Sequence, residues 1–213
     1  MTLPGEPDDR LAKRALRAEV RARRAARTPE ERFAAASSLA VRVGSIPEIA
    51  ALVEAGEAGE GCVAAYASMP AEPGTDALRS LLALSGVRVL LPVIRDDGGL
   101  DWAWDGEDLV TRPGRLPVPE PGGPVVGTGA AALVDQRCQV LLLPATAVDP
   151  AGYRLGQGGG FYDRLLSELP SVLVGGPLRV AVVYDDEVLP AVPHEPHDRR
   201  IDAVLTPTTY RRW

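Results

Sequence analysis

The sequence of 213 residues is poor in several residue types, and each shortage argues against a class of protein. Its two cysteines, Cys62 and Cys138, form no Cys-x-x-Cys motif and no Cys/His cluster, so neither a disulfide scaffold nor a structural zinc site is expected. The N-terminal residues contain no apolar segment of the signal-peptide kind. The longest apolar run with a single interruption, at 140–148, is far too short to cross a bilayer. We therefore expect a cytoplasmic protein that does not bind membranes.

Positive charge is also scarce, and lysine is almost absent. The net charge is −6 and the isoelectric point is about 5.0, which argues against nucleic acid as a partner. Of the 23 basic residues only Lys13 is a lysine. With 22 glycines and 20 prolines the chain is rich in loops, yet it remains below the level that indicates disorder.

The N-terminal part predicts two helices. Residues 10–27 place apolar side chains at helical spacing and carry a single acidic residue, Glu19, beside many cations. These cations are Arg10, Lys13, Arg14, Arg17, Arg21, Arg23, Arg24 and Arg27. Thr28, Pro29 and Glu31 have the pattern of a capping box with proline in the first turn, and Pro47 is expected to end the second helix. The chain thus opens with a helical hairpin whose first member is basic.

Strands and helices then alternate. Strands are expected at 62–68, 87–94, 100–104, 140–143, 180–183 and 203–205, and helices at 75–84 and 161–169. Residues 111–129 are rich in proline and glycine and are expected to form a long surface loop. The pattern predicts one three-layer α/β domain over 1–213, with a largely parallel, Rossmann-like sheet and a flexible segment at 1–9.

A glycine-rich loop at 149–160 is the strongest candidate for a site. It leaves a core strand and runs into a helix, and open α/β sheets bind their ligands at such positions. It is neither a Walker A loop, since no Gly-Lys-Ser/Thr follows, nor a dinucleotide fingerprint, since the glycines stand too far from the strand. Glycines alone would also suit a flexible surface loop. Arg154 before them and Asp163 after them favour an anion site with a metal.

Around this loop and in several other segments, the chain resembles the 5-formyltetrahydrofolate cyclo-ligase family, also called methenyltetrahydrofolate synthetases. The similar segments are LLLPATAVDPAGYRLGQGGGFYDRLL at 141–166, KRALR at 13–17, YASMPAE at 66–72 and HDRRID at 197–202. They lie in the order expected for the family and extend over essentially the whole chain. The resemblance implies ATP- and Mg²⁺-dependent closure of a C–N bond on a reduced folate, by a monomer.

The resemblance also implies roles for individual residues, with Lys13 and Arg154 as catalytic residues. It assigns ATP binding to Lys13, Arg14, Ala15, Leu16, Arg17, Arg154, Leu155, Gly156, Gln157, Gly158, Gly159, Gly160, Phe161 and Tyr162. It assigns substrate binding to Ala67, Glu72, Gln157, Gly158, Gly159, Gly160 and Phe161, and Mg²⁺ to Asp163 and Asp198. The lone lysine thus falls where the family has its phosphate-binding lysine.

Two other functions stay open. The chain departs from the family pattern at Leu116, Gln157 and Phe161, so a nucleotide-dependent enzyme of the same family with a different substrate is one alternative. The other is a non-enzymatic relative whose basic first helix binds RNA or a protein.

Several further charged and aromatic residues are expected to have no functional role. Solvated positions are expected for Arg21, Arg23, Arg24, Arg27, His194, His197 and residues 185–187. Trp102 and Trp104 are expected to share one face of a strand and to pack there.

Overall fold

The computed structural model describes residues 7–56, 60–106, 108–111 and 118–213. Helix α1 begins at Pro7, so the end of the segment expected to be flexible is helical, and its first six residues lie outside the described residues. The helices are α1 (Pro7–Ala26), α2 (Pro29–Arg42), α3 (Pro47–Ala55), α4 (Asp76–Leu84), α5 (Gly129–Asp135) and α6 (Phe161–Glu168). Short 3₁₀ turns are η1 (Val43–Ser45), η3 (Val172–Val174) and η4 (Asp185–Glu187).

One sheet of eight described strands, in the order β12-β11-β10-β7-β1-β2-β3-β6, forms the centre of the molecule. Its members are β1 (Cys62–Ala64), β2 (Val89–Ile94), β3 (Leu100–Trp104), β6 (Val125–Thr128), β7 (Cys138–Pro144), β10 (Leu178–Val182), β11 (Ala203–Leu205) and β12 (Tyr210–Arg212). The five strands from β11 to β2 are parallel, and the outer strands β12, β3 and β6 run antiparallel to their neighbours. The largely parallel sheet expected from the sequence is confirmed.

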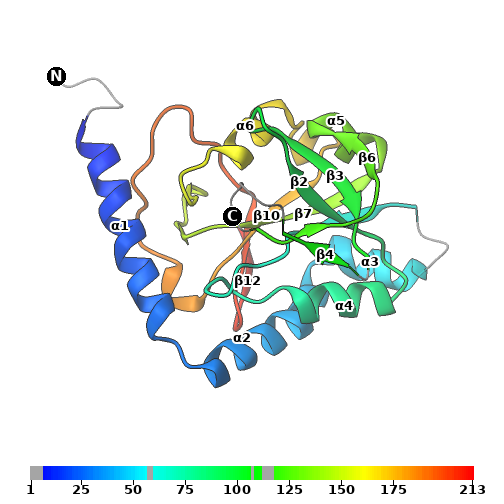
Figure 1. Ribbon diagram of the computed structural model, residues 1–213, viewed down its shortest axis with the longest axis horizontal. Coiled ribbons are helices and arrows are strands. Elements are labelled where there is room, and N and C mark those ends of the chain that lie inside the picture. The colour runs from blue at the N-terminus through cyan, green and yellow to red at the C-terminus, as the bar shows by residue number, and fades with distance from the viewer. Residues whose placement is uncertain (1–6, 57–59, 107, 112–117) are drawn as a thin grey trace.

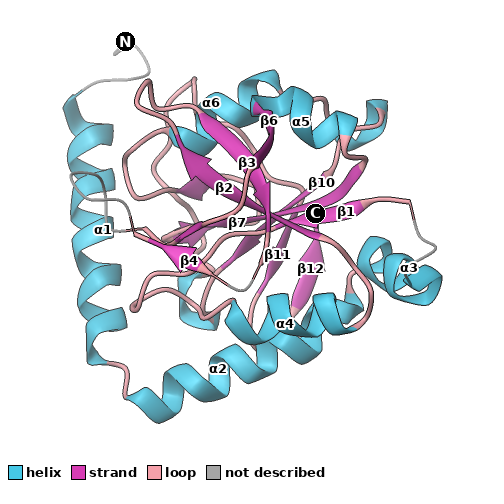
Figure 2. Ribbon diagram, turned by 45° about the vertical axis from the view of Figure 1, so that its right-hand side comes forward, coloured by secondary structure: helices cyan, strands magenta, loops and turns pink. Residues whose placement is uncertain are grey.

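Helices cover both faces of this sheet and make it three layers (Figure 2). Strand β7 shows why: Val140 and Leu142 belong to a core with residues of α2, α3 and α4, whereas Leu141 and Leu143 belong to a second core with residues of α5 and α6. A strand buried on both sides must be apolar without alternation, which explains the run of leucines.

Helix α1 belongs to neither face and stands along one edge of the molecule (Figure 1). The two expected N-terminal helices are present, and Thr28 and Glu31 form the expected capping box at the start of α2. Only α2 packs on the sheet, where it contacts α4. The cations of α1 instead reach segments that follow β7, β9 and β10, so this helix lies over the carboxyl ends of the parallel strands.

The prediction of a long surface loop over 111–129 is wrong for the last part of that range. After the short pair β4 (Leu109–Val110) and β5 (Glu120–Pro121), residues 125–128 form β6 at the edge of the sheet, and α5 follows directly. Gly127 permits this, because a Cβ there would lie 2.6 Å from the Cβ of Ala132. The second helix was expected to end at Pro47, but α2 already ends at Arg42 and is followed by η1, and Pro47 instead begins α3, which the sequence analysis missed.

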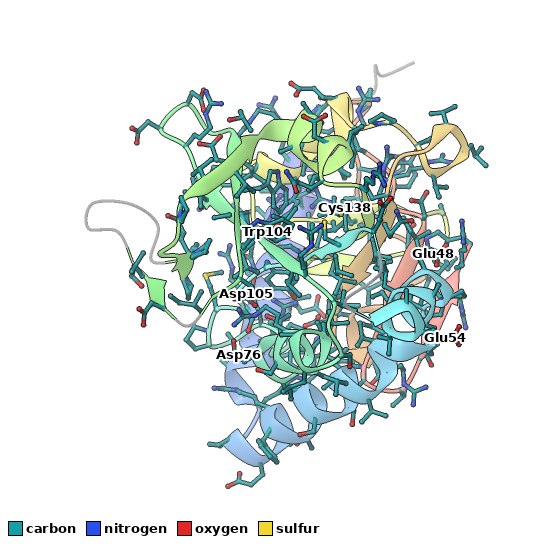
Figure 3. The ribbon with its side chains drawn as sticks, turned by 90° about the vertical axis from the view of Figure 1, so that its right-hand side faces the viewer. Glu48, Glu54, Asp76, Trp104, Asp105 and Cys138 are labelled. Carbon is teal, nitrogen blue, oxygen red and sulfur yellow. The ribbon has the colours of Figure 1, made fainter. Side chains whose placement is uncertain are left out.

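A second hollow of about 840 Å³ lies at the amino end of β2, away from the carboxyl ends of the parallel strands. Asp76 and Asp105, labelled in Figure 3, both accept hydrogen bonds from Arg79, at 2.5 and 2.6 Å.

The two cysteines are buried register partners on β1 and β7, and Trp102 and Trp104 pack on the α5–α6 side, as expected. No single helix among the described residues is long and apolar enough to cross a membrane; α2 with η1 passes such a test only together with α3, across an 80° bend.

Candidate active site

A cavity of about 930 Å³ lies at the carboxyl ends of the parallel strands, beneath α1. Its apolar wall comes from the ends of β1, β2 and β7 and includes Tyr66, Ile94 and Pro144, whereas its polar wall comes from α1, the glycine-rich loop and the segment at 195–198. Open α/β sheets bind ligands at this edge because the strands end there and their connecting loops diverge. This volume lies at the upper end of the range of about 300–1,000 Å³ that is usual for small-molecule sites.

The glycine-rich loop forms one side of the cavity. The hairpin of β8 (Ala147–Val148) and β9 (Arg154–Leu155) leads into it, and α6 begins where it ends. Gly158 and Gly160 have φ angles of 105° and 69°, a left-handed backbone that residues with a side chain rarely adopt. Residues 154–163 all line the cavity. The first free N–H groups of α6 therefore point to a place where an anion is favoured.

Arg154 and Asp163 form an ion pair at the base of this loop. Nη2 of Arg154 donates to Oδ1 of Asp163 at 3.0 Å, and the Arg154 side chain is only 3% exposed. Its Nε is buried and makes no hydrogen bond to any described residue. A buried donor without a partner is costly, so a ligand oxygen that reached Nε would relieve a real deficit.

The first helix contributes Lys13 and Arg17. Nζ of Lys13 donates to Glu195 Oε2 at 2.8 Å and to Asp198 Oδ2 at 2.5 Å, and its side chain is 7% exposed. Burial lowers the pKa of Lys13, but the hydrogen bonds and charges of Asp198 and Glu195 outweigh burial and leave the pKa raised. Nε of Arg17 donates to the carbonyl of Gly156 at 2.8 Å. The helix is thus fastened to the glycine-rich loop and to the segment at 195–198.

Glu72 lies on the wall formed after β1. Its carboxylate accepts from the backbone N–H of Met69 at 3.0 Å and from Nε2 of Gln157 at 3.4 Å, and the residue is 7% exposed. Burial raises the pKa of Glu72, although the Met69 N–H opposes this effect. The hydroxyls of Tyr66 and Tyr162 are buried without a partner in the described chain, and the charge of Glu72 adds to burial in raising the pKa of both. This wall therefore offers a carboxylate beside two unused hydroxyls.

Asp163 and Asp198 both line the cavity, and each pairs with a cation. Within the described ranges no group of three or more His, Cys, Asp or Glu side chains could enclose a metal ion by itself. Magnesium is commonly held by one or two carboxylates, with water and substrate phosphates as the remaining ligands. Asp163 and Asp198 are side chains of the type that such an ion uses, and both face the same cavity.

The model of the 5-formyltetrahydrofolate cyclo-ligase family matches residues 9–207. The chain belongs to this family. It is similar to the 5-formyltetrahydrofolate cyclo-ligase of Mycolicibacterium smegmatis, with 40% identity over 152 residues that cover 68% of this chain and 73% of the relative. The enzyme of the same name from Escherichia coli is 30% identical over 199 residues, which cover 91% of this chain and all of the relative. The chain is thus an enzyme of the cyclo-ligase class.

A solved structure agrees with this assignment. The NMR structure of the 5,10-methenyltetrahydrofolate synthetase of Aquifex aeolicus matches with a TM-score of 0.72 and 25% identity, over 94% of this chain and 92% of that one. The α/β fold of this cyclo-ligase is therefore shared with a solved 5,10-methenyltetrahydrofolate synthetase.

Most residues that the sequence analysis assigned to ATP and folate line the cavity beneath α1 in this cyclo-ligase. The exceptions are on α1: Ala15 is exposed, and Leu16 packs against the small core of Ala147, Leu155 and Val192. Leu116 lies outside the described residues. His194 and His197 are exposed, as expected, and Arg21 is exposed but reaches the cavity rim, where Nη2 contacts Oε1 of Gln157 at 3.2 Å.

Three charged residues were misassigned or missed. The solvated positions expected for Arg24 and Glu187 are wrong, because the two form a buried ion pair. Glu195, which holds Lys13, was overlooked beside its histidine neighbours. Its spacing of three residues from Asp198 was the one available signal, since such a pair in a tight turn can face the same cation.

Proposed function

We propose that this chain converts 5-formyltetrahydrofolate to 5,10-methenyltetrahydrofolate, with ATP consumed to ADP and phosphate. Membership of the cyclo-ligase family supports the reaction class. One observation carries the residue assignment: Lys13, Arg17, Arg154 and the glycine-rich loop line the same cavity as Glu72. A site that activates one substrate with another needs both in contact, and this cavity offers phosphate-binding groups and a heterocycle-binding carboxylate together.

In the proposed reaction the formyl oxygen attacks the γ-phosphorus of ATP, and ADP leaves. N10 then attacks the formyl carbon and loses its proton, the C–O bond breaks, and inorganic phosphate departs with the oxygen. Phosphorylation is needed because an amide oxygen is a poor leaving group, whereas phosphate is a good one. The chemistry demands positioning and charge neutralisation more than a protein nucleophile.

The cations would hold the phosphates. Lys13 supplies a compact ammonium whose third N–H is left for a phosphate oxygen, and Arg154 supplies its unpartnered Nε. The loop N–H groups beside Gly158 and Gly160 would neutralise the remaining charge. Mg²⁺, held by Asp163 and Asp198, would screen the charge that develops between the β- and γ-phosphates.

Glu72 would orient the folate by accepting N–H groups of the pterin ring, since an ionised carboxylate accepts two hydrogen bonds side by side. Nε2 of Gln157 donates to Oε1 of Glu72 at 3.4 Å. The amide would have to yield this oxygen to the pterin. Because the family pattern differs at Gln157, a related substrate with a different ring edge is the second candidate.

The alternative of an RNA-binding protein has less support. Lys13, Arg24 and Arg27 are engaged with carboxylates of this chain, so α1 does not present its cations as one free stripe. A salt-steep affinity for RNA without nucleotide binding would favour that alternative.

The test is a spectrophotometric assay with 5-formyltetrahydrofolate, Mg²⁺ and ATP, in which the near-UV band of the methenyl product is followed. We expect the band to grow only when ATP is present, and to grow far more slowly with Arg154→Met. The variant Arg137→Met, which removes an exposed arginine just before β7 at the opposite end of the sheet, is the matched control and should behave like the unmodified protein. A flat trace from folded protein that binds ATP would refute the folate assignment and favour another substrate.

A further inference from the structure

A buried ion pair fastens the second half of α1 to the body of the protein. Nε and Nη2 of Arg24 donate to the two carboxylate oxygens of Glu187 at 2.7 and 2.8 Å, and the side chains are 2% and 1% exposed. Nη2 also donates to the carbonyl of Ala145 at 2.7 Å. One guanidinium therefore joins α1 to the segment after β7 and to η4 after β10.

The same pair is connected to Glu72. Oε2 of Glu187 also accepts from the backbone N–H of Tyr184 at 2.9 Å, and the Tyr184 hydroxyl donates to the backbone carbonyl of Glu72 at 3.2 Å. The charges of Arg24 and Glu187 also reach the Glu72 carboxylate, where Arg24 lowers the pKa and Glu187 raises it. Buried hydrogen bonds on either end of Tyr184 thus link α1, through this one residue, to the backbone of the residue proposed to hold the folate.

The geometry of α1 extends this link to the proposed ATP site. Lys13, Arg17, Val20 and Arg24 are spaced by four, three and four residues, so they share one face of a continuous helix. Val20 is fully buried. Because a helix is stiff over three turns, the orientation of Arg24 determines where Lys13 and Arg17 stand over the cavity.

Stability alone does not account for such a pair. Two apolar side chains of similar volume in the same place would stabilise a fold about as well, because burying two charges carries a large desolvation cost. What apolar side chains would lack is the fixed, bidentate geometry and the hydrogen bonds to Ala145 and Tyr184. The pair therefore suits a role in which orientation matters.

We propose that Arg24 and Glu187 are positioning residues that couple the nucleotide side of the cavity to Glu72, so that ATP and the reduced folate each bind more tightly when the other is present. The inference rests on the proposed function, in which α1 holds the phosphates and Glu72 the pterin. The coupling is reciprocal, since whichever ligand fixes the network first leaves less of it to be ordered by the second.

The experiment measures this coupling by calorimetry. The Kd of a non-hydrolysable ATP analogue with Mg²⁺ is determined with and without saturating 5-formyltetrahydrofolate, and the ratio of the two values is the coupling factor. We expect a factor of about ten for the unmodified protein, within the usual range for coupled sites. In the double variant Arg24→Met/Glu187→Met, which leaves no unpaired buried charge, the factor should fall below about two while both ligands still bind.

The matched control is Glu60→Met/Arg137→Met, which removes an ion pair of two exposed side chains just before β7, at the opposite end of the sheet from the cavity. It should retain the full coupling factor. If Arg24→Met/Glu187→Met is not folded, Glu187→Gln serves instead, because it keeps the shape and removes the charge, and it should reduce the factor in the same direction.

Three results would overturn the inference. The first is a double variant in which both affinities and the melting temperature fall but the coupling factor persists, as expected of a merely structural pair. The second is an unmodified enzyme that cyclises the folate yet shows no coupling, which refutes the inference and leaves the proposed function standing. The third is an unmodified protein that binds the ATP analogue but does not bind or cyclise the folate, which refutes both.

Discussion

Lys13→Met is the sharpest single perturbation of the proposed site. Methionine keeps the length and apolar character of the buried lysine stem and removes only the ammonium. In the unmodified chain that ammonium contacts Glu195 and Asp198, whose side chains are 10% and 12% exposed. Removing one partner of a buried pair costs about 3–5 kcal/mol, and because these carboxylates retain some contact with water we expect the lower end, about 3 kcal/mol.

The same substitution is expected to impair catalysis. A hydrogen bond to a charged group contributes about 1.5–3 kcal/mol, so loss of the phosphate contact should lower kcat/KM for ATP by roughly 10- to 150-fold. A loss of 3 kcal/mol in stability should lower the melting temperature by roughly 6–12 °C for a chain of this size. Both effects can be measured on one preparation by steady-state kinetics and thermal unfolding.

The pH dependence of the stability difference provides an internal check. Hydrogen bonds from Lys13 hold the pKa of Glu195 below its usual 4.5, and leave that of Asp198 below its usual 3.8 in spite of burial. The stability that these carboxylates contribute is present above those usual values and is lost as the pH falls through the lowered ones. The raised pKa of Lys13 means that the contribution persists until the pH rises beyond 10.5. The difference between the two proteins should therefore be largest from pH 5 to about 10.

A folded Lys13→Met protein with unchanged kcat/KM for ATP would refute the assignment of Lys13 to the phosphates. A melting temperature within about 2 °C of the unmodified value would refute the energetic role of its ion pairs. Arg137→Met is the control, because it removes a cation whose side chain is 62% exposed, at the opposite end of the sheet from the cavity.

Three further predictions test the other walls of the cavity. Asp163→Asn should raise the Mg²⁺ concentration needed for half-maximal rate, and an unchanged metal titration would contradict its role. Glu72→Gln should raise KM for the folate at least tenfold and leave KM for ATP within about threefold. Burial raises the pKa of Glu72, so any fall in rate at acidic pH that comes from its protonation should be absent from this variant. A reversed pattern of KM values would mean that the two sites are exchanged. Gly158→Ala, at a φ of 105°, should cost about 1–3 kcal/mol and weaken ATP binding more than folate binding, whereas equal effects on both ligands would argue against a loop dedicated to phosphate.

The parts of the fold predicted from the sequence are those determined by local pattern. The leucines of β7 indicate a strand buried on both faces, and Thr28 with Glu31 marks the start of α2 through hydrogen bonds that span three residues. The glycine-rich loop was found for the same reason, since its glycines, Arg154 and Asp163 are consecutive or nearly so. The cavity wall from Tyr66 to Glu72 was found only through the resemblance to the family, because an isolated glutamate in a loop has no local signature.

The errors at β6 and α5 have a different cause. Proline and glycine dominate 111–129, and such composition is typical of a loop when each residue is considered with its sequence neighbours alone. In the structure Gly127 is a strand residue, because only a residue without a side chain lets α5 approach β6 at Ala132. The glycine meets a tertiary requirement that its immediate neighbours do not reveal.

The environments of the α1 cations could not be predicted from their sequence neighbours either. Because these environments differ, the cations need different tests. Periodicity places Lys13, Arg17 and Arg24 on one basic face, and charge alone predicts that this face is solvated. Their environments are determined by partners far along the chain: Glu195 and Asp198 for Lys13, Gly156 for Arg17, and Glu187 for Arg24. Lys13 is proposed to give its third N–H to a phosphate, whereas Arg24 uses Nε and Nη2 within the protein. Loss of a ligand-binding cation should change affinity, but loss of an internal one should change how the two affinities depend on each other.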